Sequence, residues 1–380
     1  MTVFLEDIMR ICYINPTFLI RRPVSELIDR LGDKDEIGLF VPKKLFKKVD
    51  DKWHNDSALR KAKIYPYSAL SLPGNFEWPI PITPMFFINL FRVFLRYDVL
   101  HMWAYFYINS VFAVLAKLFF PGKRLIMSCD TFPGYSFSSG KLIDSLFFLY
   151  SKIFGWFVFS VPDKVHLYGK SMINYARKAG VKKKKIIVIP TGINLDKFKQ
   201  AKDIRESLGI SEDEFVIIYA GLMVPRKGID VMLKAVRKMD VKLVLAGDGP
   251  KKKEYVDMAQ RLKLDNVIFL GWRKDIPSLL KSADMLLLPS RGEGLPGIVM
   301  EAMASGLAVA ASDVGCISDL IKDGENGFLC PVDDVDCFVR KIKKMAGDKE
   351  MCAELGKKGY EKIKEFSWEK LISEYKGMYV

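Results

Sequence analysis

Histidine and cysteine are scarce in this sequence, and their spacing matches no familiar metal site. The 380 residues include three histidines and six cysteines, and no two cysteines form a C-x-x-C pair or a repeated spacing. This argues against a zinc site and against a disulfide framework. We therefore expect no metal ion and a reducing, cytoplasmic setting. The first residues also lack a basic leader followed by a short apolar run and a cleavage site, so nothing predicts export.

Acidic residues are outnumbered by basic ones, but only in one half of the chain. The formal net charge is +14. Residues 1–200 contain 30 Lys and Arg against 16 Asp and Glu, whereas residues 201–380 contain 29 of each. The first half also holds 21 of the 26 phenylalanines. Basic and aromatic side chains together suit a lipid headgroup region. Because no nucleic-acid motif accompanies them, we predict an anionic membrane surface as a partner and no nucleic acid.

Short apolar runs alternate with helical patterns along the whole chain, which predicts an α/β protein with a parallel sheet in each half. A chain of 380 residues is expected to form two domains of ordinary size. The expected strands are 10–15, 36–41, 62–67, 99–103, 124–129, 164–168 and 186–190 in the first half, and 215–220, 242–246, 267–271, 285–288, 308–311 and 327–330 in the second.

The most informative stretch begins EGLPGIVMEAM, directly after the expected strand 285–288. It contains two carboxylates, Glu293 and Glu301, eight positions apart around a turn that opens a helix. Pro296 suits the first helical position, and the free amides beside it would face an anion with the helix dipole behind them. A diphosphate fits such a site, with one carboxylate on either side to accept hydrogen bonds from sugar hydroxyls.

This stretch resembles the Glu-x7-Glu signature of retaining glycosyltransferases of family 4. Other blocks similar to that family follow one another in the family's order: YAG at 219–221, PRKGID at 225–230, AGDGP at 246–250, FLG at 269–271, AD at 283–284 and LPS at 288–290. Several short motifs in order are more specific than one. The resemblance implies the GT-B fold, in which two Rossmann-like domains face each other across a deep cleft. It assigns 1–197 to an acceptor-binding, membrane-facing domain, 198–362 to a nucleotide-sugar-binding domain, and 363–380 to a C-terminal helix that crosses back to the first domain.

The resemblance also implies the chemistry. A sugar would leave its nucleotide diphosphate with retention, the departing phosphate would take the acceptor proton, and no metal or other cofactor would be needed. Glu293 would bind sugar hydroxyls, while Arg226 and Lys227 would neutralise the diphosphate. The helix dipole disfavours cations at a helix start, so a functional role for these two is favoured. The positions implied to bind a UDP- or GDP-sugar are Gly221, Gly271, Trp272, Arg273, Gly294, Leu295, Pro296, Gly297, Ile298 and Glu301.

Two loops of the first half depart from the family pattern. Where many members carry a histidine, this chain has Cys129 and Asp130. Asp130 is either a catalytic-site residue at a strand end or a cap of the following turn. The Gly-Gly loop after the first strand is replaced by a loop with Arg21 and Arg22. These arginines either meet an acceptor that carries both phosphate and hydrocarbon, or are ordinary surface charges.

Two apolar stretches bear on the membrane. Residues 99–116 contain no charged side chain, yet we interpret them as a buried strand and a core helix, not as a membrane span. Residues 145–161 carry aromatic side chains around too much of a helical wheel for one buried stripe, and 85–96 do the same. We predict that part of both helices stays exposed and contacts the inner leaflet peripherally. The residues named for this contact are Phe154, Trp156 and Phe157, with Lys43, Lys44, Lys47, Lys48 and 182–185 as basic support.

These patterns predict a retaining hexosyltransferase that moves a sugar from a UDP- or GDP-sugar to a lipid-linked saccharide or a phospholipid at the cytoplasmic membrane face. A sugar-nucleotide epimerase or hydrolase on the same double fold is the alternative enzyme. A catalytically silent, membrane-bound scaffold that keeps a nucleotide cleft is the alternative from another class. Leu222, which stands where the family often has another arginine, and the missing histidine motivate that second alternative.

Overall fold

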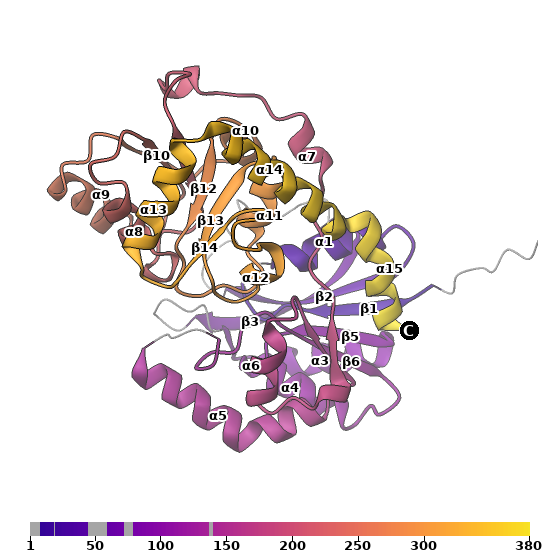
Figure 1. Cartoon of the computed structure of the whole chain (residues 1–380). Coiled ribbons are helices and arrows are strands. Elements are labelled where there is room, and N and C mark those ends of the chain that lie inside the picture. The colour runs from indigo at the N-terminus through magenta and orange to yellow at the C-terminus, as the bar shows by residue number, and fades with distance from the viewer. Residues whose placement is uncertain (1–7, 19, 45–58, 72–78, 137–139) are drawn as a thin grey trace, which may run out of the picture.

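Two α/β units make up the molecule, each built on its own sheet (Figure 1). The computed structural model describes residues 8–18, 20–44, 59–71, 79–136 and 140–380. The first unit carries the N-terminal half of the chain, and the second carries residues from about β9 to α14. A final helix, α15, returns to the first unit (Figure 1).

The first sheet has eight strands in the order β4-β3-β2-β1-β5-β6-β7-β8. Neighbours pair in parallel except β3 and β4, which are antiparallel. The strands are Arg10–Ile14 (β1), Glu36–Lys44 (β2), Ala62–Ser71 (β3), Pro79–Pro81 (β4), Val99–Trp103 (β5), Arg124–Cys129 (β6), Lys164–Leu167 (β7) and Ile186–Val188 (β8). All seven strands expected here are present. The Pro-Ile-Pro strand β4 was missed because proline cannot donate to a ladder and so gives little strand signal away from an edge.

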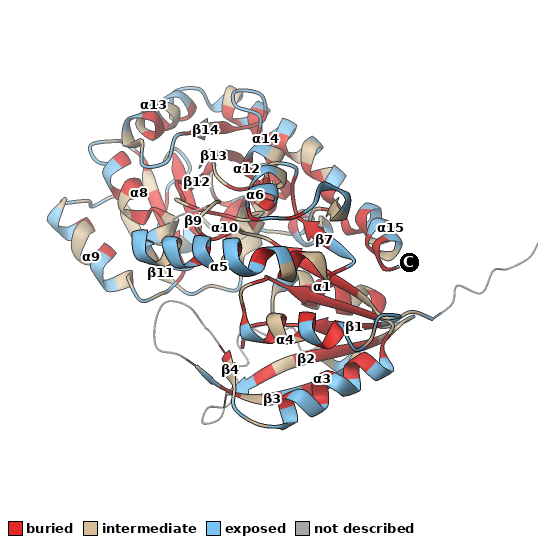
Figure 2. Ribbon diagram, turned by 90° about the horizontal axis from the view of Figure 1, so that it is seen from below, coloured by how far each residue is buried: buried red, intermediate tan, exposed pale blue. Residues whose placement is uncertain are grey.

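Helices cover both faces of this sheet. They are Arg22–Leu31 (α1), Met85–Arg96 (α3), Ile108–Lys117 (α4), Lys141–Ser160 (α5) and Met172–Lys178 (α6), with the 3-10 turn Lys183–Lys185 (η2). Alternation along β1 assigns the faces: Ile11 and Tyr13 share a core with α1, whereas Cys12 and Ile14 share one with α3 and α4. Helices α3, α4 and α5 form the outer layer of the first unit, which faces the viewer in Figure 2.

The second sheet is entirely parallel, in the order β11-β10-β9-β12-β13-β14. Its strands are Val216–Ala220 (β9), Lys242–Ala246 (β10), Val267–Gly271 (β11), Met285–Leu288 (β12), Ala308–Ser312 (β13) and Phe328–Cys330 (β14). All six were expected from the sequence. Such a sheet reverses its order between the first and fourth strands, here β9 and β12, and that reversal is where open α/β sheets bind ligands. The first sheet reverses in the same way between β1 and β5.

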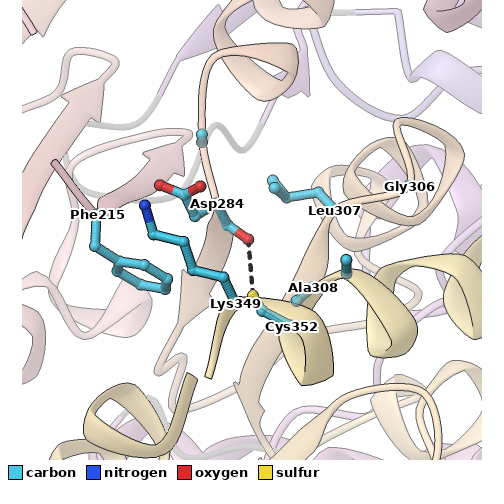
Figure 3. A pocket seen from close by; sticks show the side chains of 9 residues that line it. Phe215, Asp284, Gly306, Leu307, Ala308, Lys349 and Cys352 are labelled. Atoms are coloured by element: carbon cyan, nitrogen blue, oxygen red, sulfur yellow. Dashed lines mark hydrogen bonds between the residues drawn. The ribbon is translucent and has the colours of Figure 1, made fainter. Parts of the chain in front are cut away.

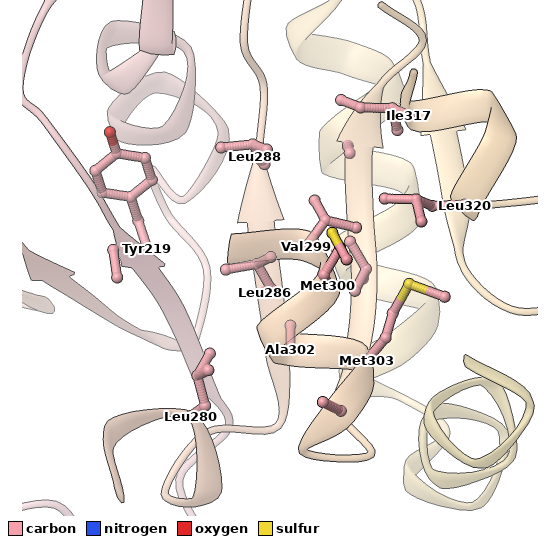
Figure 4. Packing of buried hydrophobic residues seen from close by; sticks show 14 of the residues in the cluster. Tyr219, Leu280, Leu286, Leu288, Val299, Met300, Ala302, Met303, Ile317 and Leu320 are labelled. Atoms are coloured by element: carbon pink, nitrogen blue, oxygen red, sulfur yellow. The ribbon is translucent and has the colours of Figure 1, made fainter. Parts of the chain in front are cut away.

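The helices of the second unit pack large apolar side chains inward. Figure 4 shows Leu286 of β12 beside Val299 of the helix that follows that strand, and Leu288 and Met303 belong to the same core. The segments are Asp196–Lys199 (α7), Glu206–Leu208 (η3), Pro225–Lys227 (η4), Ile229–Ala235 (α8), Lys252–Arg261 (α9), Ile276–Lys281 (α10), Gly297–Ala304 (α11), Ile317–Leu320 (α12), Val335–Ala346 (α13), Lys349–Ile363 (α14), Lys364–Phe366 (η5) and Trp368–Tyr379 (α15).

A buried chain of hydrogen bonds ties α15 to the first sheet. The Tyr379 hydroxyl lies 2.9 Å from Nδ1 of His101. Nε2 of His101 lies 2.7 Å from the Ser128 hydroxyl, which lies 2.6 Å from Nδ1 of His166. Both imidazoles are fully buried. Burial, with His166 nearby, lowers the pKa of His101, and burial lowers the pKa of His166 to about 4. Both rings are therefore neutral at pH 7.

The two apolar stretches differ in the structure. Residues 99–103 form the wholly buried strand β5 and 108–117 form α4, as expected. Helix α5 is the single helix in the described part of the chain that is long and apolar enough to cross a membrane, and 28% of its most apolar window is buried in the protein.

One cysteine pair departs from the sequence-based expectation. Cys330, at the end of β14, forms a disulfide with Cys337 in the first turn of α13. Their Cα atoms are 5.8 Å apart. The expectation of no disulfide rested on the absence of a repeated spacing, and a single strand-to-helix link leaves no such pattern. The other four cysteines are free and buried.

Candidate functional site

Four loops meet between the two units, and each leaves the carboxyl end of a strand at or beside an order reversal. Arg21 follows β1, Asp130 follows β6, Lys227 follows β9 and Glu293 follows β12. Because parallel strands end at the same edge, these loops can converge on one ligand. All of the residues predicted to be catalytic lie on them.

Glu293 is the centre of the second unit's contribution. Its carboxylate is buried, with 4% of the residue exposed. One oxygen accepts hydrogen bonds from Nζ of Lys227 and from the Ser290 hydroxyl, each at 2.6 Å. Arg226 donates to the other oxygen at 3.4 Å and also to the Gly292 carbonyl. Glu293, Arg226 and Lys227 are thus brought together, as a common site would require.

The charges of this cluster are fixed by its cations. Burial alone would raise the pKa of the Glu293 carboxyl, but Lys227 and Arg226 outweigh burial and hold that pKa below its ordinary value. Burial lowers the pKa of Lys227, against the attraction of Glu293. An ionised, hydrogen-bonded carboxylate at this depth is a strong acceptor for hydroxyl groups, and the two cations give the site a positive counterpart.

Two glycines make this close packing possible. Gly228 has a φ of 67°, and a Cβ there would lie 2.0 Å from the Pro289 carbonyl oxygen. Gly315 has a φ of 59°, and a Cβ there would lie 2.1 Å from the Glu293 carbonyl oxygen. Any other residue would meet both a backbone clash and a left-handed conformation. The turn that carries Arg226 and the loop that carries Glu293 therefore press directly against each other.

The helix after Glu293 presents its amino end to the same region. Helix α11 begins at Gly297, one residue later than predicted, so Pro296 is its N-cap and not its first residue. No acidic residue lies in its first turn, so the positive end of its dipole is not offset from within the helix. Glu301 lies one turn further in, with its side chain 17% exposed. Leu295 packs against the cores of both units.

The first unit reaches across with two arginines and one carboxylate. Arg21 donates to Asp130, and Arg22 donates to Glu301 of the second unit. Nη1 of Arg22 also lies 3.1 Å from the point where a Cβ on Gly297 would be. Arg21 thus pairs with a carboxylate of its own unit, whereas Arg22 pairs with one across the junction of the units.

Asp130 and Cys129 point to different places. The Asp130 backbone lies against Gly294, where a Cβ would be 2.8 Å from the Asp130 carbonyl oxygen. Its carboxylate meets Arg21, and Thr131 donates to it at 3.5 Å. The side chain of Cys129 is buried in the core beneath, and burial raises the pKa of its thiol well above the usual range. Of the two, Asp130 is the one that lies against the second unit.

Four more of the residues implied to bind the UDP- or GDP-sugar lie at or just after the carboxyl ends of β9 and β11. Gly221 follows β9, Gly271 ends β11, and both contact Gly247, whose amide donates to the Gly271 carbonyl at 2.6 Å. Trp272 is 38% exposed. Arg273 is held by Asp275, with its Nε 2.8 Å from the carboxylate. Gly271, Trp272 and Arg273 belong to β11 and the segment after it, whereas Glu293 belongs to the loop after β12.

Supporting residues were missed in the sequence. Ser290 holds Glu293, as described above, and its place in the LPS block three residues earlier was the available signal. Arg291 donates to Asp230 and Asp333, each at 2.7 Å, and its amide bonds the Arg226 carbonyl at 2.7 Å. Across the units, the Ser171 hydroxyl donates to Asp319 at 2.6 Å. No local pattern marks that last pair, which is 148 positions apart.

A separate cavity of about 180 Å³ lies at the other end of the second sheet. Figure 3 shows Phe215, Asp284, Ala308 and Cys352 on its walls, at the amino ends of β9, β12 and β13. It is therefore remote from the loops that carry Glu293. Within the described residues, no group of three or more His, Cys, Asp or Glu side chains is arranged to hold a metal ion.

Comparisons with known proteins agree with the resemblance seen in the sequence. The family described as Glycosyl transferases group 1 matches residues 200–362, and the family described as Glycosyltransferase Family 4 matches residues 47–197. A UDP-Gal:alpha-D-GlcNAc-diphosphoundecaprenol alpha-1,3-galactosyltransferase of Escherichia coli is 33% identical over 181 residues, which cover 43% of this chain and 46% of that protein. An uncharacterized glycosyltransferase of Methanocaldococcus jannaschii is 24% identical over 94% of this chain and 93% of its own.

The chain spans about half the length of curated relatives such as the Escherichia coli protein. Among solved structures, HepE of Anabaena in complex with UDP is 18% identical, with a TM-score of 0.78 over 97% of this chain and 99% of that chain. At that identity the likeness shows the fold, and it confirms the two-domain GT-B architecture expected from the sequence.

Proposed function

Because the chain belongs to the family 4 glycosyltransferases, also described as Glycosyl transferases group 1, we propose that it transfers a sugar from a nucleotide diphosphate to a lipid-linked acceptor. The observation that carries this proposal is the buried Glu293 carboxylate, bonded at 2.6 Å to Lys227 and flanked by Arg226, beside the amino end of α11. That cluster places a hydrogen-bond acceptor for sugar hydroxyls close to two hydrogen-bond donors for phosphate oxygens.

In the proposed complex, the diphosphate lies between the amino end of α11 and the two cations. The leaving group gains negative charge as the glycosyl bond breaks, and fixed cations and amide dipoles stabilise that charge most when water is excluded. Glu293 accepts hydrogen bonds from the sugar hydroxyls, and Glu301 accepts them from the ribose. Gly271, Trp272 and Arg273 contact the base. The UDP bound in the structural neighbour supports a uridine nucleotide over a guanosine nucleotide.

The proposed reaction retains configuration. The bond between the anomeric carbon and the diphosphate oxygen breaks, and the acceptor oxygen bonds the same carbon from the same face. The acceptor proton passes to the departing phosphate, so no protein nucleophile is required. The low basicity of the buried His101 and His166 supports this route, since both rings are engaged in the hydrogen-bond chain that leads to α15.

The acceptor is proposed to carry a phosphate and a hydrocarbon chain. Arg21 and Arg22 stand at the first unit's side of the junction, where an acceptor would enter. The name of the Escherichia coli relative specifies an acceptor sugar on diphosphoundecaprenol, which has both features. Asp130 would then contact either the donor sugar or the acceptor hydroxyl.

The experiment is a transfer assay with purified protein. UDP- and GDP-hexoses would be offered with a short-chain polyprenyl-diphosphate-linked N-acetylglucosamine, and the products separated by mass spectrometry. We expect a disaccharide product from a UDP-sugar, and the anomeric proton coupling should show retention. Release of free sugar without product, or an altered sugar nucleotide, would instead indicate a hydrolase or an epimerase. Tight UDP-sugar binding with no transfer to any acceptor would indicate a silent scaffold.

Metal independence is tested in the same assay. Arg226 and Lys227 are proposed to do the work that a divalent cation does elsewhere, so the rate should be unchanged after EDTA treatment. A loss of activity in EDTA that magnesium restores would contradict this part of the proposal.

A further inference from the structure

The outer layer of the first unit exposes an unusual amount of apolar surface. Of the 24 large hydrophobic side chains that are exposed in the described chain, 16 lie between residues 85 and 156, on or beside α3, α4 and α5. We call this surface the α3–α5 face. It consists of Met85, Phe87, Ile88, Phe91, Leu95, Ile108, Leu115, Leu118, Phe119, Leu142, Leu146, Phe148, Leu149, Ile153, Phe154 and Trp156. Figure 2 shows the three helices side by side with much of their outward surface exposed.

Helix α5 is built with its apolar side outward. Leu142, Leu146, Leu149, Ile153 and Trp156 are spaced by four and three residues, which is one stripe of a helix, and each is at least 49% exposed. The buried side of the helix comprises Phe147, Ser151, Gly155, Val158 and Phe159. A Cβ on Gly155 would lie 2.9 Å from the Ala179 carbonyl oxygen, so the helix sits close to the protein through small residues. A helix whose outer side met only water would carry polar side chains in that outward stripe.

The charges around the face are mostly positive. Helices α3 and α4 contain no acidic residue, and α5 contains one, Asp144. Arg92, Lys141 and Lys152 are exposed among the apolar side chains, and Nζ of Lys152 lies 5.0 Å above the Phe148 ring. The exposed lysines 182–184 lie on the same unit. Of the other lysines predicted to help, Lys47 and Lys48 lie outside the described residues.

We propose that the α3–α5 face docks on an anionic lipid bilayer, with α5 parallel to the membrane plane. Apolar side chains enter the acyl boundary while the basic ones meet lipid phosphates, which is how interfacial helices bind. A crossing of the bilayer by α5 is disfavoured because Phe147, Val158 and Phe159 are buried against the protein. Pairing with a second copy is disfavoured because it would bring two basic surfaces together.

This surface continues to the candidate site, and the connection to an acceptor rests on the proposed function. The loop after Asp130 leads into α5, and a Cβ on Gly134 would lie 2.9 Å from the Asp144 carbonyl oxygen in the first turn of that helix. A bilayer under α5 would therefore present a membrane-anchored acceptor phosphate at the edge that carries Asp130 and Arg21. Phe154 and Trp156, predicted as membrane residues, lie on the face, whereas Phe157 is half-buried.

Vesicle flotation of the full chain tests the docking. The vesicles would be phosphatidylcholine alone and phosphatidylcholine with phosphatidylglycerol. The test variant is Leu149→Ser with Ile153→Ser, which leaves Trp156 as a fluorescence reporter. The matched control is Ile64→Ser with Leu70→Ser. These two residues are exposed on β3 of the same unit, and strand alternation directs them away from α3, because the intervening Tyr65, Tyr67 and Ala69 share its core.

We expect the parent and the control to float with the anionic vesicles, with a blue shift of tryptophan emission, and the test variant to bind at least about tenfold more weakly. Binding to neutral vesicles should be weaker than to anionic ones. A parent that stays at the bottom of the gradient, or a test variant that floats as well as the parent, would overturn the proposal. Resistance to alkaline carbonate extraction would instead mean that α5 is inserted across the bilayer. If the parent is a dimer that does not bind vesicles, and the test variant is a monomer, a second copy covers the face.

The failure of docking can be separated from the failure of the proposed function. UDP binding is measured by thermal shift on the parent and the test variant, and it should be equal in both because the face lies outside the donor site. Transfer to a water-soluble acceptor without vesicle binding would remove docking alone. Vesicle binding without transfer to any acceptor would remove the proposed function alone.

Discussion

The sheets of the two units reverse their strand order in the same way, but the units differ in how many large apolar side chains they leave exposed. In the second unit, leucines such as Leu286 and Leu288 fill the core, and few large apolar side chains reach the surface. In the first unit, leucines of similar size on α5 face outward while Ser151 and Gly155 face inward. The same α/β architecture thus supports a unit that is complete in water and a unit with a surface suited to lipid.

The units also differ in how they contribute to the site. The second unit holds its charges in place by itself, since Glu293, Lys227 and Ser290 all belong to it and bond one another. The first unit contributes Arg21 and Arg22, whose partners lie at the junction. We infer that donor binding is prepared within the second unit, whereas acceptor entry depends on how the first unit closes on it.

The largest expected effect tests whether the second unit alone prepares the chemistry. Glu293→Gln should lower kcat/KM by roughly 10²–10³, because it removes a buried acceptor that the site has preorganised. The control is Glu254→Gln, an exposed carboxylate of the same unit that pairs only with Lys251 at the surface. Initial rates of transfer would be measured over a range of UDP-sugar concentrations. If the Glu293 variant works as fast as the control, Glu293 is not part of the chemistry.

Truncating one leucine in each unit tests whether the leucines of α5 are less buried than those of the second unit. Leu286→Ala, in the second core, should lower the free energy of unfolding by about 2–5 kcal/mol. Leu149→Ala, on the α3–α5 face, should change it by no more than about 0.5 kcal/mol in the absence of lipid. Urea unfolding followed by circular dichroism measures both. Equal losses would show that Leu149 is packed against protein and that the two units are built alike.

The neutral histidines make the first unit the acid-sensitive one. The folded-state pKa of His166 is about 4, below the ordinary value near 6.5. As pH falls below about 6.5 the unfolded chain binds protons first, so stability is lost down to about pH 4, by up to about 3 kcal/mol. The measurement is the melting temperature between pH 7.5 and pH 4 for the parent and for His166→Gln. The variant should lose part of this pH slope, and identical slopes would contradict the assignment.

The smallest expected effect tests whether the first unit contributes to donor binding. Arg22→Gln should weaken UDP binding by roughly threefold to tenfold, because Arg22 can leave Glu301 for the diphosphate nearby. Uridine, which lacks the diphosphate, should bind the variant no more weakly than the parent, since Glu301 is then free for the ribose. Calorimetric titration measures both ligands. An equal loss for the two would indicate a general disturbance of the cleft.

The fold could be predicted from the alternation of apolar runs with helical patterns and from the order of the short motifs. The apolar runs gave thirteen strands, all present, because parallel strands buried on both faces read as short continuous runs. The strand that was missed, Pro79–Pro81, is an antiparallel edge made of two prolines and one isoleucine. The Cys330–Cys337 link was missed for a related reason, since a single contact between neighbouring elements leaves no periodic trace.

The sequence predicted the part of the candidate site that lies in the second unit, but not the ion pairs that Arg21 and Arg22 make. The grouping of Glu293, Arg226 and Lys227 could be predicted because short motifs mark the loops that carry them, and the bonds between them lie within one unit. The partners of Arg21 and Arg22 were not found, since Asp130 and Glu301 are 109 and 279 positions away. Asp130 had two readings in the sequence, and its ion pair with Arg21 at the junction favours the reading as a cleft residue.

The sequence by itself determined two parallel sheets, the glycine-bounded loops at their carboxyl ends and the surplus of positive charge in the first half, because these depend on local pattern and composition. Only the tertiary structure decided which arginine meets which carboxylate, and which side of α5 is covered. Those outcomes depend on how two separately folded units close on each other and on how near a helix approaches its sheet, and neither distance is encoded in any single stretch of the chain.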